Sequence, residues 1–226
     1  MKELIEYISD LFGVYVRLVI PSNTMFWMLD YVENRQKSIY KIKIQKSEWN
    51  DIAKTQETQL TDDDFRLILK NNYNIDKLII LDHPEDPNFH IENFTKKIFR
   101  FDLQQGKWLT LENLKSLDCV ELRFKTTRKV MNQFLKYLVA GGSPRLKFFI
   151  VEIEDRRFNE AFRDLRERWK VIEGDRLKYH RRKRVTMFPA KVMQLDNQRF
   201  ASFGYFGEND SLVFGIWPDF KGNNYE

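Results

Sequence analysis

Histidine and carboxylate side chains are the first candidates for metal or acid–base chemistry in this sequence. The chain contains three histidines: His83, His90 and His180. The first two flank a loop whose carboxylates could gather a cation: Asp82, Glu85, Asp86 and Glu92. Surface loops are commonly this acidic without binding a metal. We therefore predict an ordinary acidic loop, with no metal and no cofactor.

Cysteine chemistry is limited to one residue, Cys119, which excludes an internal disulfide and any cysteine-rich zinc module, including a RING domain. Cys119 falls at the start of an expected strand, where a buried thiol packs as a small apolar side chain and is a poor nucleophile. The sequence also lacks a phosphate-cradling glycine loop, an HExxH motif and a Gly-x-Ser-x-Gly elbow. We therefore predict that the protein is not an enzyme.

The composition is that of a globular protein of 226 residues. Hydrophobic residues make up 42%, charged residues 31%, and 19 Phe and 5 Trp supply a core. No apolar run approaches the roughly 20 residues that span a bilayer, and the N-terminus does not have the pattern of a signal peptide. We expect an intracellular protein, cytoplasmic or nuclear, with no membrane partner.

The net charge is +5, and the sharpest charge feature of the chain is one basic run. This basic cluster comprises Arg176, Lys178, Arg181, Arg182, Lys183 and Arg184, with His180 among them. Such a run is compatible with nuclear import or with contact to a phosphate backbone, which would weaken steeply with salt. The alternative is a solvated linker, which we favour because Tyr179 alone supplies an interleaved aromatic ring.

Residues 108–151 contain two helix–strand units in succession. Thr110 is an expected N-cap, with Asn113 three residues on. Val120, Leu122 and Phe124 alternate with polar residues, as in a strand with one buried face. A helix with apolar residues from 130 to 138 follows, and Gly141-Gly142 is expected to end it before Pro144. Leu146, Phe148 and Ile150 then predict a second strand with those residues in the core.

The same alternation extends over most of the chain. Helical patterns at 3–12, at 24–32 and after Thr61 alternate with strand patterns at 14–20, 40–44 and 78–81, and a further strand is expected at 99–103. Strand centres at Leu18, Ile42, Ile80, Phe101, Leu122 and Phe148 are separated by 24, 38, 21, 21 and 26 residues. This spacing is typical of leucine-rich repeats. The alternative is an ordinary open α/β sheet.

We thus predict an α/β fold: an irregular leucine-rich-repeat-like solenoid over residues 1–155, followed by a C-terminal region over 156–226. That region is expected to hold an amphipathic helix (156–171), the charged linker (173–184) and a β-meander cap with strands at 190–193, 200–206 and 212–217.

Strand alternation also predicts an interaction surface. The residues that alternate with the core set would face solvent together: Arg17, Lys41, Lys43, Lys77, Arg100, Asp102, Glu121, Arg123, Lys147 and Phe149. Cations outnumber anions, so an acidic or phosphorylated protein partner is favoured. The alternative is that any solvent-facing strand surface carries long charged side chains.

The segment 108–151 resembles the type 2 F-box-associated domain of nematode F-box proteins. The likeness is carried by Thr110-Leu111-x-x-Leu114, the following strand, Asn132-x-Phe134-Leu135-Lys136, a glycine, and Ser143-Pro144-Arg145-Leu146. The family often has tryptophan ahead of the glycine, where this chain has Leu138 or the adjacent Tyr137.

The resemblance implies the substrate-binding part of an F-box adaptor of a cullin–RING ubiquitin ligase. It also implies that the β-meander caps the open end of the solenoid. An F-box would be a helical segment with an early Leu-Pro ahead of this domain. No Leu-Pro occurs in the opening stretch, so the sequence does not predict how the chain would dock to the linker protein of the ligase. Two alternatives follow: a truncated gene product, or a protein that binds partners without delivering them for ubiquitination. A nucleic-acid-associated or nuclear role through the basic cluster remains the alternative function.

Overall fold

The computed structural model describes residues 17–20, 26–34, 39–44, 60–71, 73–92, 94–104, 106, 108–153, 161–171, 177–181, 183–187, 191–196, 199–206 and 211–217. The helix expected at residues 3–12 and the start of the strand expected at 14–20 lie outside the described residues. So does the end of the chain after residue 217.

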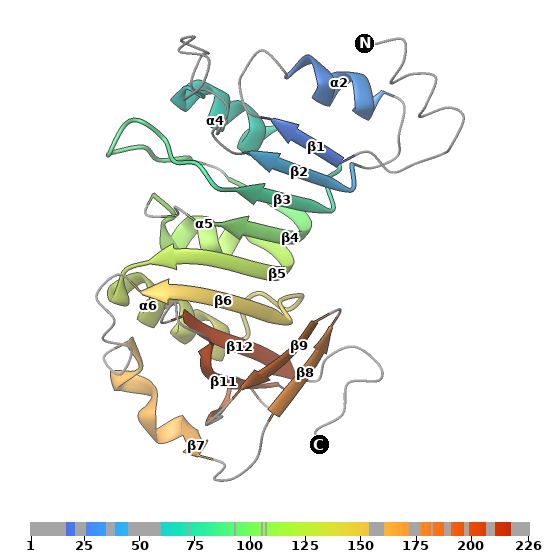
Figure 1. Cartoon of the computed structure of the whole chain (residues 1–226). Coiled ribbons are helices and arrows are strands. Elements are labelled where there is room, and N and C mark those ends of the chain that lie inside the picture. The colour runs from blue at the N-terminus through green and yellow to red at the C-terminus, as the bar shows by residue number, and fades with distance from the viewer. Residues whose placement is uncertain are drawn as a thin grey trace, which may run out of the picture.

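A ten-stranded sheet organises the described part of the chain (Figure 1). Six parallel strands follow one another in chain order: β1 (Arg17–Ile20), β2 (Lys41–Ile44), β3 (Lys77–Ile80), β4 (Lys96–Leu103), β5 (Leu117–Thr126) and β6 (Phe148–Ile153). Four antiparallel strands extend the same sheet beyond β6: β12 (Ser211–Trp217), β11 (Phe200–Phe206), β10 (Lys191–Gln194) and β7 (Trp169–Val171). The predicted mixed α/β fold is confirmed.

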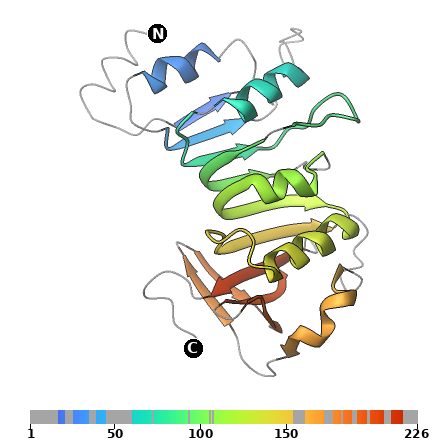
Figure 2. The ribbon, with the colours of Figure 1, turned by 180° about the vertical axis from the view of Figure 1, so that it is seen from behind.

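Four α-helices occur in the described residues: α2 (Trp27–Glu33), α4 (Asp62–Lys70), α5 (Leu111–Ser116) and α6 (Arg128–Val139). Figure 2 shows α5 and α6 in front of the parallel strands, whereas in Figure 1 they lie behind them. Thr61 and Thr110 each form a capping box, with Asp64 and Asn113 respectively, so the N-cap predicted at Thr110 is confirmed.

The end of α6 follows the predicted glycine stop. Ala140 is the C-cap, and Gly141 adopts a left-handed φ of 91° that favours glycine. A Cβ at Gly142 would lie 2.3 Å from the ring of Tyr137, so this position also needs glycine. The hydroxyl of Tyr137 donates to the carbonyl of Lys115 and accepts from the amide of Ser143, which joins α6 to α5 and to the loop before β6.

The predicted core face of β6 is wrong by one residue. Phe149, Val151 and Ile153 are buried, whereas Phe148 and Ile150 are only partly so. The register pairs Leu122 with Phe149, which aligns the buried residues of β5 and β6. Leu146 is buried as well, but in the turn before the strand, so a period of two counted from it assigns the wrong face.

The side chain of Phe149 therefore packs in the core where the parallel strands meet the antiparallel ones. Its predicted place on the partner-binding surface is wrong. Its ring stacks on that of Phe214 of β12, with centroids 4.1 Å apart and an interplanar angle of 8°. It also packs edge-on against Phe134 of α6, and Phe214 packs against Phe203 and Phe162. Aromatic pairs of this kind bury large areas.

Two further predictions in the C-terminal region are corrected. In place of an amphipathic helix reaching Val171, the described residues form a 3₁₀ helix (Arg163–Arg168) and then strand β7, which pairs with β10. The expected charged linker contains two strands, β8 (Leu177–Arg181) and β9 (Lys183–Met187), paired as an antiparallel hairpin. The predicted meander strands are confirmed as β10, β11 and β12.

Candidate functional site

The register gathers most of the predicted partner-binding residues on one surface. We call the solvent-facing side of β1–β6, opposite α5 and α6, the open face. Arg17 lies beside Lys41 and Lys77 beside Arg100, while Lys41 and Lys77 immediately precede the paired residues Ile42 and Leu78. A second row contains Lys43 and, on β4 and β5, the pair Asp102 and Arg123. Neighbouring strands are about 4.8 Å apart, so these side chains are close neighbours.

Two of the predicted residues do not belong to these rows. Phe149 is buried in the core, as described above. Lys147 lies one residue before β6, is half-buried, and is held by a hydrogen bond from its backbone N–H to the carbonyl of Val120.

The open face is electrostatically divided, and its β1–β3 part is basic. Arg17, Lys41, Lys43 and Lys77 form no ion pair with any carboxylate of the described residues. Cations placed side by side on adjacent strands repel one another. Because these cations lie together and none has a counter-ion in the described part of the chain, an anionic ligand is favoured.

Tyr40 holds two of these cations in place. The Arg17 guanidinium carbon lies 5.4 Å from the Tyr40 ring centroid and the Lys77 ammonium 4.3 Å from it. Lys77 Nζ also donates a hydrogen bond to Tyr40 Oη at 2.7 Å. These cation–π contacts restrict the two charged groups to one small region beside Lys41. We call Arg17, Tyr40, Lys41 and Lys77 the Tyr40 cluster.

The β4–β6 part of the open face is neutralised internally. Arg100 contacts Asp102 at 2.8 Å and Glu121 at 3.9 Å, and Arg123 contacts Glu152 at 2.9 Å. Arg100 and Arg123 are therefore on the predicted surface, but their charge is largely committed. Phe148 and Ile150 add partly exposed apolar area to this half.

Beyond β6, the side of the sheet that continues the open face is covered. Residues 201–204 and 211–216 are all buried, and β9 lies against β11 (Figure 1). Four residues of the basic cluster lie on the strands of the β8–β9 hairpin: Lys178, Arg181, Lys183 and Arg184. The register pairs His180 with Arg184 and Arg181 with Lys183. Arg176 and Arg182 lie outside the described residues.

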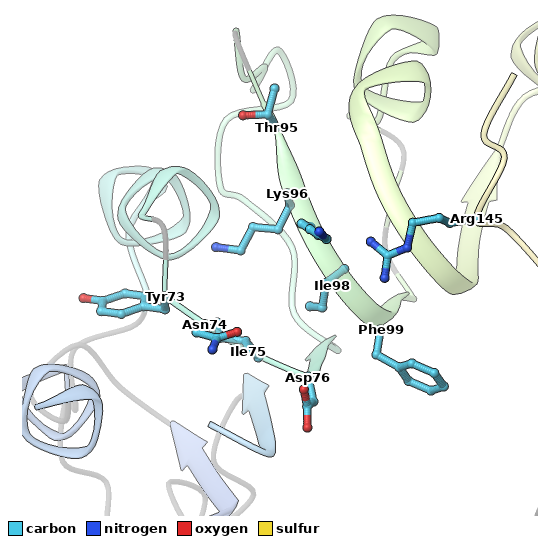
Figure 3. A pocket seen from close by; sticks show the side chains of 10 residues that line it. Tyr73, Asn74, Ile75, Asp76, Thr95, Lys96, Ile98, Phe99 and Arg145 are labelled. Atoms are coloured by element: carbon cyan, nitrogen blue, oxygen red, sulfur yellow. The ribbon is translucent and has the colours of Figure 1, made fainter. Parts of the chain in front are cut away.

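A cavity of about 550 Å³ lies where β3 and β4 begin (Figure 3). Its lining combines the segment 73–76, the segment 95–99 and Arg145. Arg145 is paired with Asp118 at 2.8 Å. Lys96 is 5% exposed, and its Nζ donates to the carbonyls of Ile68 at 3.1 Å and Asn71 at 2.5 Å. This lysine thus satisfies carbonyls at the C-terminal end of α4. Sequence reasoning did not identify the cavity, because it depends on how two loops meet.

Within the described ranges, no group of three His, Cys, Asp or Glu side chains converges on one point. His83 lies 3.6 Å from Asp82, and His90 lies 3.9 Å from Glu92. Cys119 is buried in β5, and desolvation raises the pKa of its thiol to about 12, which disfavours the thiolate.

Residues 87–151 match the family model described as F-box associated. The matched segment runs from the loop before β4 into β6, so it contains α5, α6 and the neutralised half of the open face except Glu152 and Ile153. The resemblance predicted from residues 108–151 is thereby confirmed. The basic half on β1–β3 lies outside the matched segment.

No curated protein and no solved structure matches the chain. In the part of the chain that the structure describes, no helix is both long and apolar enough to span a lipid bilayer.

Proposed function

We propose that this chain is a protein-recognition module that binds an acidic protein partner through the open face. The observation that carries the proposal is the set of cations on β1–β3 that have no counter-ion among the described residues, next to a segment that matches the F-box associated family. The neutralised half, with Phe148 and Ile150, would supply apolar contact, and the basic half would supply electrostatic steering.

The fold proposal that accompanies this function is an irregular leucine-rich-repeat-like solenoid. It is supported by parallel strands that follow chain order and by helices between them that pack on the other side. Solenoids present an extended strand surface to their ligands. In this arrangement β12, β11, β10 and β7 would close the end of the solenoid beside β6.

The family match supports a specific context for such binding. We propose that the chain serves as the substrate-binding part of an F-box adaptor in a cullin–RING ubiquitin ligase, in the cytoplasm or nucleus, and that it performs no catalysis itself. Other subunits would then catalyse ubiquitin transfer, and the open face would select the substrate.

The test is affinity purification of the tagged chain from its native cells, compared with the double variant Lys41→Glu/Lys43→Glu. We expect proteins that are retained by the native chain and lost with the variant. Recovery of the linker protein and cullin of the ligase with them would support the adaptor context, whereas partner proteins without any ligase component would leave a recognition module outside a ligase. The matched control is Lys129→Glu/Arg163→Glu, which makes the same change of net charge at exposed positions on α6 and the 3₁₀ helix. Equal retention by all three chains would refute recognition by the open face.

The second candidate, nucleic-acid binding, is favoured by one observation: the hairpin β8–β9 brings the strand residues of the basic cluster together. If this function is the correct one, retention in the same purification will be sensitive to nuclease. It will also fall steeply with salt and disappear when Lys178, Arg181 and Arg184 are replaced by glutamine.

A further inference from the structure

The Tyr40 cluster has the features of a built anion subsite. Arg17, Lys41 and Lys77 come from three adjacent strands, and Tyr40 holds Arg17 and Lys77 over its ring. A cation that is already oriented loses less side-chain entropy when it binds an anion. The three groups together offer guanidinium and ammonium donors within one small area.

The charge of this cluster exceeds what one carboxylate neutralises. A carboxylate carries a single charge, whereas a phosphate monoester carries about −1.5 to −2 near pH 7 and has three strong acceptor oxygens. Arginine matches a phosphate through two parallel N–H groups, and lysine adds a point charge. The other cations of the open face, Arg100 and Arg123, are already paired with carboxylates. Among the cations that the structure describes on this face, those of the Tyr40 cluster therefore suit a dianion best.

We infer that the Tyr40 cluster binds a phosphorylated side chain of the protein partner. This inference rests on the proposed function and specifies the chemistry of its ligand. Arg17 and Lys41 contact the phosphate oxygens, and Lys77 contributes its remaining N–H donors. Tyr40 acts as a positioning residue that fixes Arg17 and Lys77 through its ring and its hydroxyl group.

The probe is a degenerate peptide library with phosphoserine at its centre, compared with libraries that carry serine or glutamate at that position. At near-physiological salt the chain should retain the phosphoserine library at least about tenfold better than the serine library, since a hydrogen-bonded charge pair is worth about this much. It should also prefer phosphoserine to glutamate. Arg17→Gln and Lys41→Gln should each reduce retention about tenfold, and the control Lys129→Gln should leave it unchanged.

Tyr40 provides a test that does not alter net charge. Tyr40→Leu should weaken phosphopeptide retention because Arg17 and Lys77 are released, while Tyr40→Phe, which keeps the ring, should weaken it less. Urea unfolding of each variant checks that the fold is intact. If both tyrosine variants retain the library as the native chain does, the positioning role is refuted.

The remaining outcomes separate this inference from the proposed function. Equal retention of the glutamate and phosphoserine libraries would overturn the phosphate subsite and leave a generally acidic partner. If no library is retained but Lys41→Glu/Lys43→Glu still abolishes capture of intact proteins, the subsite is likewise refuted and the recognition module is not. If neither peptides nor proteins depend on these cations, both proposals fail.

Discussion

The ammonium group of Lys77 lies 4.3 Å from the ring centroid of Tyr40 and donates a hydrogen bond to its hydroxyl oxygen at 2.7 Å. This contact ties the residue before β2 to the first residue of β3 on the basic half of the open face. Tyr40→Leu removes both the cation–π contact and the hydrogen bond. We expect a loss of about 1 kcal/mol in the free energy of unfolding, measured with urea. Tyr40→Phe should lose less, and a larger loss for Tyr40→Phe would contradict this assignment.

Substitution by alanine should destabilise the protein far more at Phe149 than at the neighbouring Phe148. Phe149→Ala opens a cavity against Phe214 and Phe134 and should reduce the free energy of unfolding by about 3–5 kcal/mol. Phe148→Ala, at the partly exposed neighbouring position, should cost much less. Urea denaturation of both variants measures the difference. The reverse order of the two losses would mean that the register of β6 is wrong.

Lys96 is expected to contribute to stability because, unlike most lysine side chains, it is buried. Lys96→Met removes the donor to the carbonyls of Ile68 and Asn71 and should reduce the free energy of unfolding by about 1–3 kcal/mol. Lys97→Met, one residue later at an exposed position, should stay within about 0.5 kcal/mol of the native value. Amide exchange at the end of α4 should accelerate in the Lys96 variant alone.

Cys119 gives a prediction about pH. Because burial raises the pKa of its thiol from 9.0 to about 12, the native state holds a proton that the unfolded chain releases between these values. The contribution of this group to stability is therefore fully present below about pH 9 and is lost as the pH rises toward 12. Cys119→Ala should remove that part of the pH dependence, as measured by urea unfolding across this range.

The accessibility of the same thiol provides a simpler check. A thiol-alkylating reagent near pH 8 should leave the native chain unmodified and should modify the chain in urea, since the buried group is neither exposed nor ionised. Rapid alkylation of the folded protein would contradict the buried position of Cys119 in β5.

The sequence alone predicts those structural features that are determined by one short stretch of residues. Thr61 and Thr110 are followed three residues later by side chains that complete capping boxes, and Gly141 supplies the left-handed residue that ends α6. The parallel strands were predictable for the same reason, since β-branched and aromatic residues alternate with charged ones. The cations Arg17, Lys41, Lys43 and Lys77 followed directly from that alternation.

Features that depend on distant segments could not be predicted from the sequence. Phe149 faces the core because β6 is paired with β5 and β12 at once, and no local pattern distinguishes it from Phe148. Trp169 fits a helical pattern, yet pairing with Met193 places it in a strand. The role of Tyr40 depends on contacts with β1 and β3, and the ion pairs of Arg100 and Arg123 depend on the register. The division of the open face into two halves was therefore visible only in the structure.

The most direct test of recognition by the open face is quantitative affinity purification with the native chain, Lys41→Glu/Lys43→Glu and Lys129→Glu/Arg163→Glu. We predict that specific partner proteins are depleted with the first variant and retained with the second. Equal recovery from all three chains, with each variant shown to be folded, would contradict partner binding at this surface.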